Sequence, residues 1–433
     1  MSKKQSALAP FKKPLILLGG FLLLVLVFGK IVPAIRNVKS STSPIVGIQA
    51  SCEKSYQNTE TLNLDDFEIM AIHENGDQST LSAEEVQLVD DTVAMTGKYT
   101  EAEIVLTANE EISCTVQVPN ERKEIVSFEC GNPVISDVKA VLYSNGELCF
   151  EGEGDILRFD DRDYPWMNYD GDDDNPIRSI SFEDTVTPAN MDGFFEDIES
   201  LEYIANIPFS VESLSYTFSG CESLTHIPDL DQCENLLDMS ETFADCISLK
   251  EIPSIPPSVV NTSEMCYRCQ ELQTAPDMAK ATGLQDATAM FQECKKLTKT
   301  NMPPNVKIID KMYYACINLK SMPEIPESVI SMDSTFQDDV NLSKLTIIPK
   351  NVTNVSNCLS GCGKIKGLLW IDGNPEKYSN FLNDSAIATK VDLQGNSKML
   401  DILANTADDN INITVNGKEP NKDVRYSDIV ILD

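Results

Sequence analysis

The fold is decided by FSGCESLTHIP at Phe218–Pro228 and FADCISLKEIP at Phe243–Pro253, because the second stretch repeats the pattern of the first. A bulky anchor residue opens each copy, and it recurs at intervals of 22 to 25 residues from about residue 188 onward. The eight anchors are Phe195, Phe218, Phe243, Cys266, Phe291, Tyr313, Phe336 and Leu359. An aliphatic residue stands six positions after every anchor. Repeats of this length are typical of a solenoid, in which stacked units share one core.

Each repeat also has a regular pattern before its anchor. Apolar residues prevail seven and four positions before it, and a small residue, most often cysteine, follows three positions after it. Steps of three and four residues place side chains on one face of a helix, and Ser, Asn or Gly precedes the pattern as a favoured N-cap. Each unit is therefore predicted to be a short capped helix, a turn and a short extended piece such as Leu224–Pro228. Eight such units at the spacing of neighbouring strands would make a slab about 40 Å long.

These motifs carry a family resemblance. Phe218–Pro228, Phe243–Pro253 and YACINLKSMPEIPESVISMDSTF at Tyr313–Phe336 resemble the leucine-rich repeats of BspA-type bacterial surface proteins, over about residues 188–368. The segment around Pro165-Trp166 and residues 177–184 resemble the stretch that precedes such repeats. The resemblance implies an exported or surface-anchored protein that binds host or matrix proteins or other cells, and not an enzyme. This chain departs from the pattern at Asp339, which replaces a repeat cysteine, and in its predicted N-terminal anchor.

The beginning of the chain differs in charge from the rest. The whole sequence has 34 basic and 68 acidic residues, a net charge of −34, yet Pro14–Gly29 is an uncharged apolar run that lysines precede. Residues 14–35 are predicted to be a transmembrane helix, with a cytoplasmic tail at 1–13 by the positive-inside rule. The protein would then be a single-pass protein of the cell membrane, with its C-terminal body outside the cytoplasm at the cell surface. A cleaved signal peptide is the alternative.

The remaining boundaries follow from changes in pattern. Short strands at hairpin spacing favour an antiparallel sandwich, which weakly resembles bacterial immunoglobulin-like modules, and Asn145-Gly146 predicts a type I′ hairpin turn. The predicted segments are a spacer at 36–60, the sandwich at 61–120, a hairpin and acidic loop at 121–187, the solenoid at 188–368 and a cap at 369–433.

Few residues suggest chemistry. The acidic loop places Asn168, Asp170, Asp172 and Asp174 in alternation, which is compatible with calcium, but its glycine is misplaced for an EF-hand, so a solvated loop is the other interpretation. The two histidines, His73 and His226, are predicted at a strand end and on the surface, in neither case as catalytic groups.

The 13 cysteines are an odd number, and seven of them fall on repeat positions. They are interpreted as reduced core thiols, with a redox ladder as the alternative. Cys266 and Cys269 have the spacing of half a zinc site without a second pair. Cys130 and Cys149 form the most plausible disulfide. Asp339 is expected to accept backbone hydrogen bonds or to face water.

The sequence therefore predicts an α/β solenoid of leucine-rich repeats, with a short helix and a short strand in each 23-residue coil. A small all-β sandwich and one N-terminal transmembrane helix would precede it. The predicted function is binding or adhesion at the cell surface, with an extracellular protein or matrix ligand as the partner and the membrane contacted through the N-terminal helix. No catalytic residue, cofactor or metal ligand is expected, and the net charge disfavours nucleic acid. A basic or polar partner would suit acidic residues between the anchors, which include Asp229, Asp231, Glu251, Glu324 and Glu327. The alternatives are a passive envelope or stalk component and, less favoured, a carbohydrate-active enzyme with paired carboxylates.

Overall fold

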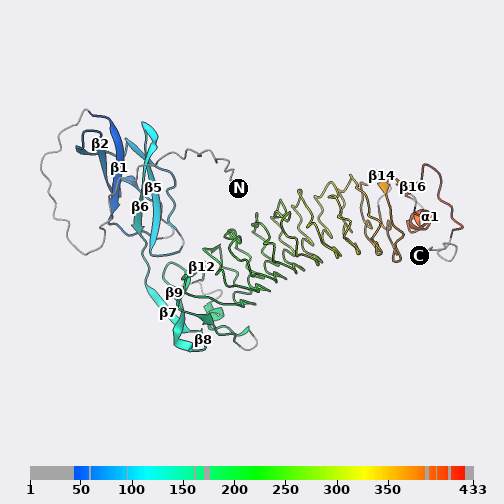
Figure 1. Ribbon diagram of the computed structural model, residues 1–433, viewed down its shortest axis with the longest axis horizontal. Coiled ribbons are helices and arrows are strands. Elements are labelled where there is room, and N and C mark those ends of the chain that lie inside the picture. Colours follow the sequence, from blue (N-terminus) through cyan, green and yellow to red (C-terminus); the bar gives the residue numbers. More distant parts are fainter. Residues whose placement is uncertain are drawn as a thin grey trace, which may run out of the picture.

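The structure is a computed structural model, which describes residues 43–57, 60–94, 96–159, 162–169, 176–385, 390–395, 397–407 and 411–424. Figure 1 shows a β-sandwich, a small sheet region and a long stack of coils, in that order along the chain. Among the described residues, five belong to an α-helix, α1 (Leu400–Ala404).

The sandwich consists of two three-stranded antiparallel sheets. One contains β1 (Ile45–Cys52), β2 (Phe67–His73) and β3 (Gln78–Thr80), and the other contains β4 (Val86–Leu88), β5 (Tyr99–Leu106) and β6 (Asn109–Pro119). A 3-10 turn, η1 (Leu64–Asp66), precedes β2. Buried and exposed residues alternate along β2 and through the first half of β5, as expected for strands with one face on a core.

Two predictions for this region are corrected. The strands follow consecutive order within each sheet, whereas immunoglobulin domains have Greek-key connections between their sheets, so the immunoglobulin-like assignment is not supported. Strand β1 also lies inside 36–60, which the sequence predicted to be a spacer. It was missed because only one residue of its first five is buried.

A five-stranded sheet follows, in the order β13-β12-β10-β9-β7. Its strands are β7 (Glu124–Glu129), β9 (Val138–Tyr143), β10 (Glu147–Gly152), β12 (Ser179–Phe182) and β13 (Tyr203–Ile204). The short strands β8 (Gly131–Asn132) and β11 (Asp155–Ile156) pair beside it, with the 3-10 turns η2 (Ile135–Asp137) and η4 (Pro165–Tyr169).

The predicted hairpin joins β9 to β10, but its turn differs from the prediction. Gly146 has a φ of 79°, while Asn145 is not among the residues with positive φ. A type I′ turn needs two such residues, so Ser144-Asn145-Gly146 forms a three-residue loop with a left-handed glycine at its end instead.

A buried charge pair joins this sheet to the sandwich. The carboxylate of Glu147 is fully buried and lies 3.2 Å from the guanidinium of Arg122. It also accepts hydrogen bonds from the Ser181 hydroxyl at 2.6 Å and from the backbone N–H of Gly97, in the sandwich, at 2.9 Å. Arg122 lies over the ring of Tyr143 at 3.5 Å. Polar contacts of this kind fix the geometry of the junction.

An aromatic cluster closes the first coil of the solenoid. The buried Trp166 donates from its indole N–H to the carbonyl of Phe194 at 2.7 Å and stacks on Tyr164. Phe150 lies edge-on to Trp166 and to Phe195. One continuous hydrophobic cluster runs from here through every coil to β16 (Asn412–Val415), while the sandwich has a separate core. The five-stranded sheet thus covers the open end that a solenoid would otherwise expose.

The predicted column of anchors is present. The rings of Phe195, Phe218 and Phe243 are stacked with centroids 5.5 and 5.9 Å apart, and Phe291, Tyr313 and Phe336 continue the stack at 5.7 and 5.6 Å. All eight anchors are buried. Chain order and register therefore agree with the sequence repeat.

The prediction of a helix in each coil is wrong. Two residues of every coil have a φ between 52° and 77°, at the second position before and the second position after the anchor, as Tyr216 and Gly220 show. A left-handed residue every four positions prevents an α-helical hydrogen-bond ladder. Alternate N–H groups bond instead within the coil and to the next coil: Cys221 donates to the carbonyl of Phe218, and Phe218 donates to that of Thr242. Each coil is a series of turns, and the solenoid is mostly β and turn structure.

The predicted extended pieces form a second parallel ladder. It includes the bridges Tyr203 with His226, Thr274 with Lys299, and Ser321 with Lys344. The ladder widens into a parallel sheet of β14 (Lys366–Trp370), β15 (Lys390–Gln394) and β16. The turn pattern also continues at Leu382, because Leu359 donates to the carbonyl of Phe381.

The predicted anchor at 14–35 lies outside the described residues. Where the structure does describe the chain, it contains no helix with both the length and the apolar character needed to cross a membrane. The prediction of a single-pass protein located in the cell membrane conflicts with this finding and is withdrawn.

Candidate binding groove

The structure brings two of the predicted acidic residues together in a groove near the C-terminal end of the solenoid. Glu324 and Glu327 line two adjacent hollows of about 460 and 400 Å³, and Ile325 lies between them and is shared by both. The other lining residues are Thr300, Asn301, Met302, Pro323, Pro326, Thr346, Ile347, Pro349 and Asp372. Asp229, Asp231 and Glu251, which the sequence also suggested, are exposed and do not line these hollows.

The groove forms where prolines interrupt the ladder. Pro323 and Pro326 have no N–H to donate, and a residue before proline is held extended. Backbone bonds between coils are present at Met322, which donates to Lys344, and at Ile348, which donates to Trp370. After Met322, the next N–H of this coil that donates to a neighbouring coil is that of Ile330, to Lys307. Residues 323–329 thus make no backbone–backbone hydrogen bond to a neighbouring coil among the described residues, which leaves the hollows.

The lining combines negative charge with apolar surface. Its charged groups are the exposed carboxylates Glu324, Glu327 and Asp372, and no lysine or arginine lines either hollow. Ile347 is 53% exposed. Within the described chain, no salt bridge engages the three carboxylates. A concave site of this composition suits a cationic group next to an apolar one.

Trp370 stands at the edge of the groove. It is 41% exposed and donates from its indole N–H to the carboxylate of Asp372. The sequence analysis missed both residues and Ile347. A signal was available at the eleventh position after the anchor, where early coils carry Asn206, Asp229, Ser254 and Asp277, while later coils carry the groove residues Met302, Glu324 and Ile347 and then Trp370.

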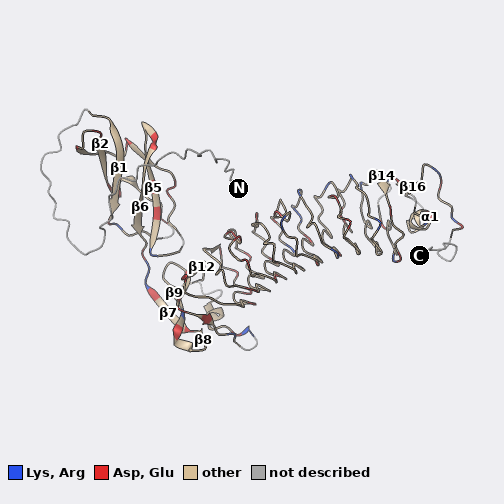
Figure 2. Cartoon of the chain, in the orientation of Figure 1, with Lys and Arg blue, Asp and Glu red and all other residues tan. Residues whose placement is uncertain are grey.

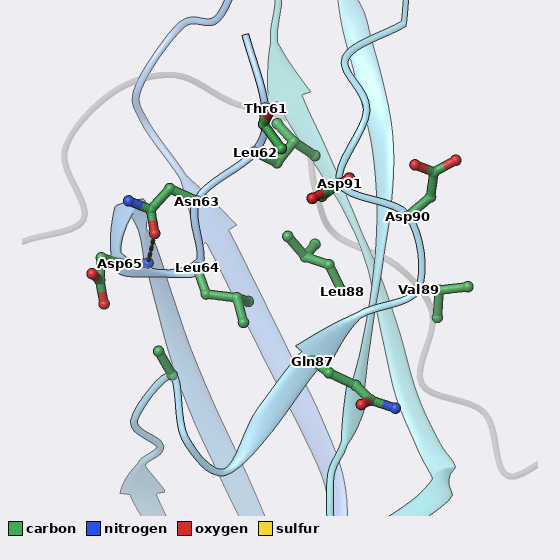
Figure 3. Close-up of a pocket in the computed structure, with 11 residues that line it drawn as sticks. Thr61, Leu62, Asn63, Leu64, Asp65, Gln87, Leu88, Val89, Asp90 and Asp91 are labelled. Carbon is green, nitrogen blue, oxygen red and sulfur yellow. Dashed lines mark hydrogen bonds between the residues drawn. The ribbon is translucent and has the colours of Figure 1, made fainter.

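A larger hollow of about 760 Å³ lies at the edge of the sandwich (Figure 3). Leu62, Leu64 and Leu88 line it together with Asp90 and other carboxylates. Asp90 accepts hydrogen bonds from the backbone and the hydroxyl of Thr92, which lower the pKa of its carboxyl group. These bonds stabilise a turn, and the lining contains no cationic, histidine or cysteine side chain. We therefore do not assign a site to it.

The repeat cysteines form a ladder of buried thiols. Six of the seven, all except the anchor Cys266, donate from sulfur to the carbonyl of the anchor in the preceding coil, as Cys316 does to Phe291 at 3.1 Å and Cys362 does to Phe336 at 3.0 Å. All thirteen cysteines are free, so the predicted Cys130–Cys149 disulfide is not formed. Cys130 belongs to the main cluster, whereas Cys149 alternates with the clustered Phe150 and therefore faces the opposite side of the sheet.

Asp339 occupies one step of this ladder. Its side chain is fully buried, and neither carboxylate oxygen has a hydrogen-bond partner in the part of the chain that the structure describes. The expectation that it would face water is therefore wrong, while the backbone of Cys316 interacts with the carboxylate and favours its charged form less than burial opposes it. Burial raises the pKa of its carboxyl group well above the ordinary value, which favours the neutral acid.

Other singled-out residues are accounted for as follows. His226 is exposed and stacks on Tyr203 at 4.4 Å, while His73 is buried at the end of β2, where its ring nitrogens contact the Ser43 carbonyl and the Ser79 hydroxyl. Cys266 and Cys269 occupy the anchor and ladder positions of one coil. Asp170, Asp172 and Asp174 of the suggested calcium loop lie outside the described residues. In the described ranges, no group of His, Cys, Asp or Glu side chains has the arrangement of a metal site.

These observations define a class of molecule: a leucine-rich-repeat solenoid with an acidic groove. Residues 189–287 and 287–391 match the family described as the BspA type leucine rich repeat region, in six copies. The repeat region belongs to this family, which confirms the resemblance of the repeat motifs.

Solved structures with similar chains are also leucine-rich repeat proteins. One from Bacteroides ovatus is 20% identical, with 68% of this chain and 77% of that chain covered and a TM-score of 0.42. A leucine rich cell surface protein from Faecalibacterium prausnitzii is 16% identical over 77% of this chain and 98% of its own, with a TM-score of 0.30. No curated protein matches the sequence.

Proposed function

We propose that the solenoid is a non-enzymatic binding module, which attaches to a protein partner by taking a basic, extended segment into the groove at Glu324, Glu327 and Asp372. The observation that carries this proposal is the composition of the groove, which has three carboxylates without a salt bridge among the described residues and no basic side chain around an apolar floor. A Lys or Arg side chain would find opposite charge there, and a neighbouring aliphatic side chain would contact Met302, Ile325 or Ile347.

The geometry of the groove supports a segment of chain over a compact ligand. The two hollows are continuous through Glu324, Ile325 and Glu327, and together they extend over four neighbouring coils. At about 4.8 Å between neighbouring strands, four coils span about 14 Å, the length of roughly four extended residues.

The full chain can be tested with short peptides that alternate arginine and leucine, against peptides that alternate glutamate and leucine. The protein has two tryptophans, of which Trp166 is buried and Trp370 is exposed beside the groove, so its intrinsic fluorescence reports on occupancy. We expect saturable binding of the basic peptides only, weakened at least tenfold in the triple variant E324Q/E327Q/D372N. The variant D229N/D231N/E251Q carries the same change of charge outside the groove and should bind like the wild type.

Equal binding by both triple variants would contradict the assignment of the groove. An absence of saturable binding to any basic peptide would favour the alternative, in which the solenoid is a passive structural component.

A further inference from the structure

A second charged surface lies on the ladder of extended segments, and its sign is opposite to that of the groove. Five consecutive coils carry an exposed lysine seven or eight residues after their anchors. These residues, which we call the lysine strip, are Lys299, Lys320, Lys344, Lys366 and Lys390. Figure 2 shows how basic and acidic residues are distributed along the chain.

The backbone places the lysines of neighbouring coils side by side. Lys344 donates from its N–H to the carbonyl of Lys320 at 3.1 Å, and Lys366 of β14 pairs in register with Lys390 of β15. Neighbouring strands are about 4.8 Å apart, so Lys366 and Lys390 emerge at this spacing. Lys344 pairs with Ser321 and is therefore offset by one residue from Lys320.

None of the five lysines forms a salt bridge within the described residues. Salt bridges between neighbouring coils are possible in this region of the solenoid, as one example shows. Nearby Lys296 pairs with Glu271 of the preceding coil at 2.5 Å. Like charges directly opposite each other on neighbouring strands are unfavourable, by about 0.8 kcal/mol at 5 Å in water. In a chain with twice as many acidic as basic residues, this concentration of unpaired lysines is a surface that an anionic ligand would stabilise.

The strip ends beside an exposed aromatic side chain. Lys366, Leu368 and Trp370 alternate along β14 and are all exposed, so they share one face of the strand. Next to them, Lys390, Asn412 and Thr414 line a shallow hollow of about 290 Å³. Asp392 also lines the hollow, but its carboxylate already accepts hydrogen bonds from Gln394, Thr414 and Gly417. Trp370 itself pairs with Gln394 of β15 outside this hollow. An exposed aromatic face next to an amide side chain is suited to the flat apolar face of a sugar ring.

We propose that the lysine strip binds a linear polysaccharide that carries carboxylate or sulfate groups, with a sugar ring against Trp370. Charges on such a polymer are spaced by whole sugar rings, which is comparable to the spacing of the coils. Duplex nucleic acid has one charge per about 1.7 Å, which lysines on successive coils about 4.8 Å apart do not match. A bilayer would require a broad basic plane, whereas these lysines occupy one of two adjacent positions in each coil.

The strip and the groove are separate sets of side chains on neighbouring parts of the coils. Glu324 follows Lys320 by four residues, or about 13 Å of extended chain, whereas Thr300 of the groove directly follows Lys299. The two sets share no residue, so a variant of one surface keeps the ligand contacts of the other.

The test is a titration of the full chain with heparin and with polygalacturonate, and with neutral dextran as a control polymer. We expect both anionic polymers to bind, and dextran not to bind. The variant K320Q/K344Q/K366Q/K390Q should bind them at least tenfold more weakly and with a smaller dependence on salt concentration. The variant K98Q/K123Q/K280Q/K307Q removes the same charge from exposed lysines elsewhere and should stay within twofold of the wild type. W370A should weaken polymer binding about threefold or more.

The proposal is overturned if the two lysine variants bind equally, if neither anionic polymer binds, or if single-stranded DNA or phosphatidylglycerol vesicles bind more tightly than the polysaccharides. The groove variant E324Q/E327Q/D372N should keep its polysaccharide binding. Failure of the peptide titration would therefore leave the polysaccharide proposal intact. Failure of the polysaccharide titration would likewise leave the proposal for the groove intact.

Discussion

Replacing Asp339 with cysteine should stabilise the solenoid, because it restores the interrupted ladder of thiols. Both oxygens of Asp339 are buried without a hydrogen-bond partner among the described residues, and such a group destabilises a protein by about 1–3 kcal/mol. A thiol at this position can donate to the carbonyl of Tyr313, as Cys316 and Cys362 do to their own anchors at 3.1 and 3.0 Å. We expect D339C to raise the free energy of unfolding by about 1–3 kcal/mol.

The same substitution should change the dependence of stability on pH. Burial raises the folded-state pKa of Asp339, so the folded protein keeps this proton at pH values where the unfolded chain has lost it. The resulting stability is fully present below about pH 3.9 and is lost as pH rises through the folded pKa, at about 1.36 kcal/mol per pH unit. D339C should remove this dependence of the unfolding free energy on pH. D339N should remove it too, but it keeps a buried polar group and should be less stable than D339C.

The assay is chemical denaturation of the three proteins at several pH values between 4 and 8, with urea as denaturant. The reasoning is refuted if D339C is less stable than the wild type, or if it loses stability with rising pH as steeply as the wild type does.

Three further predictions concern other parts of the chain. G361A should destabilise the protein by about 1–3 kcal/mol, because Gly361 has a φ of 71° and an added Cβ would lie 2.1 Å from a carboxylate oxygen of Asp338. G417A is the control, because a Cβ added at Gly417 would meet no atom within 4 Å. Equal thermal stability of the two variants would contradict the predicted strain at Gly361. E147A removes one of the two carboxylates beside the buried guanidinium of Arg122, the other being Glu151 at 3.1 Å, and leaves the Ser181 hydroxyl and the Gly97 N–H without their acceptor. It should cost about 1–3 kcal/mol, measured by denaturation, and a change below about 0.5 kcal/mol would show that the junction tolerates the loss. Alkylation of the native chain at pH 8 should label only the partly exposed Cys52 and Cys114, because the other eleven thiols are buried, and mass spectrometry of labelled peptides would detect any exception.

The register of the solenoid could be predicted from sequence because inward positions recur with the coil. Phe218, Phe243 and Phe336 are stacked members of one buried column, as their spacing indicated. The conformation between these positions could not be read in the same way. A series of turns with left-handed residues at positions such as Glu241 and Asp245 also directs every third or fourth side chain inward, so its apolar period is that of a helix.

The groove was predictable only in part, for a related reason. Glu324 and Glu327 are close in sequence, and their exposure follows from their positions between anchors. Asp372 and Ile347 reach the same groove from later coils, and lateral contact of this kind depends on where prolines open the ladder. The absent Cys130–Cys149 bond has a similar origin, because strand alternation, and not sequence distance, places the two thiols on opposite faces.

The central claim is that the coils form one stack with a shared core, and a double-mutant cycle on the anchor column tests it most directly. Unfolding free energies are measured for F218A, F243A and F336A and for the pairs F218A/F243A and F218A/F336A. Phe218 and Phe243 are adjacent and stacked at 5.9 Å, so we expect a coupling energy of about 0.5–1.5 kcal/mol for the first pair. The distant pair should be additive within about 0.5 kcal/mol. Additivity of the adjacent pair, or equal coupling in both pairs, would contradict the stacked arrangement.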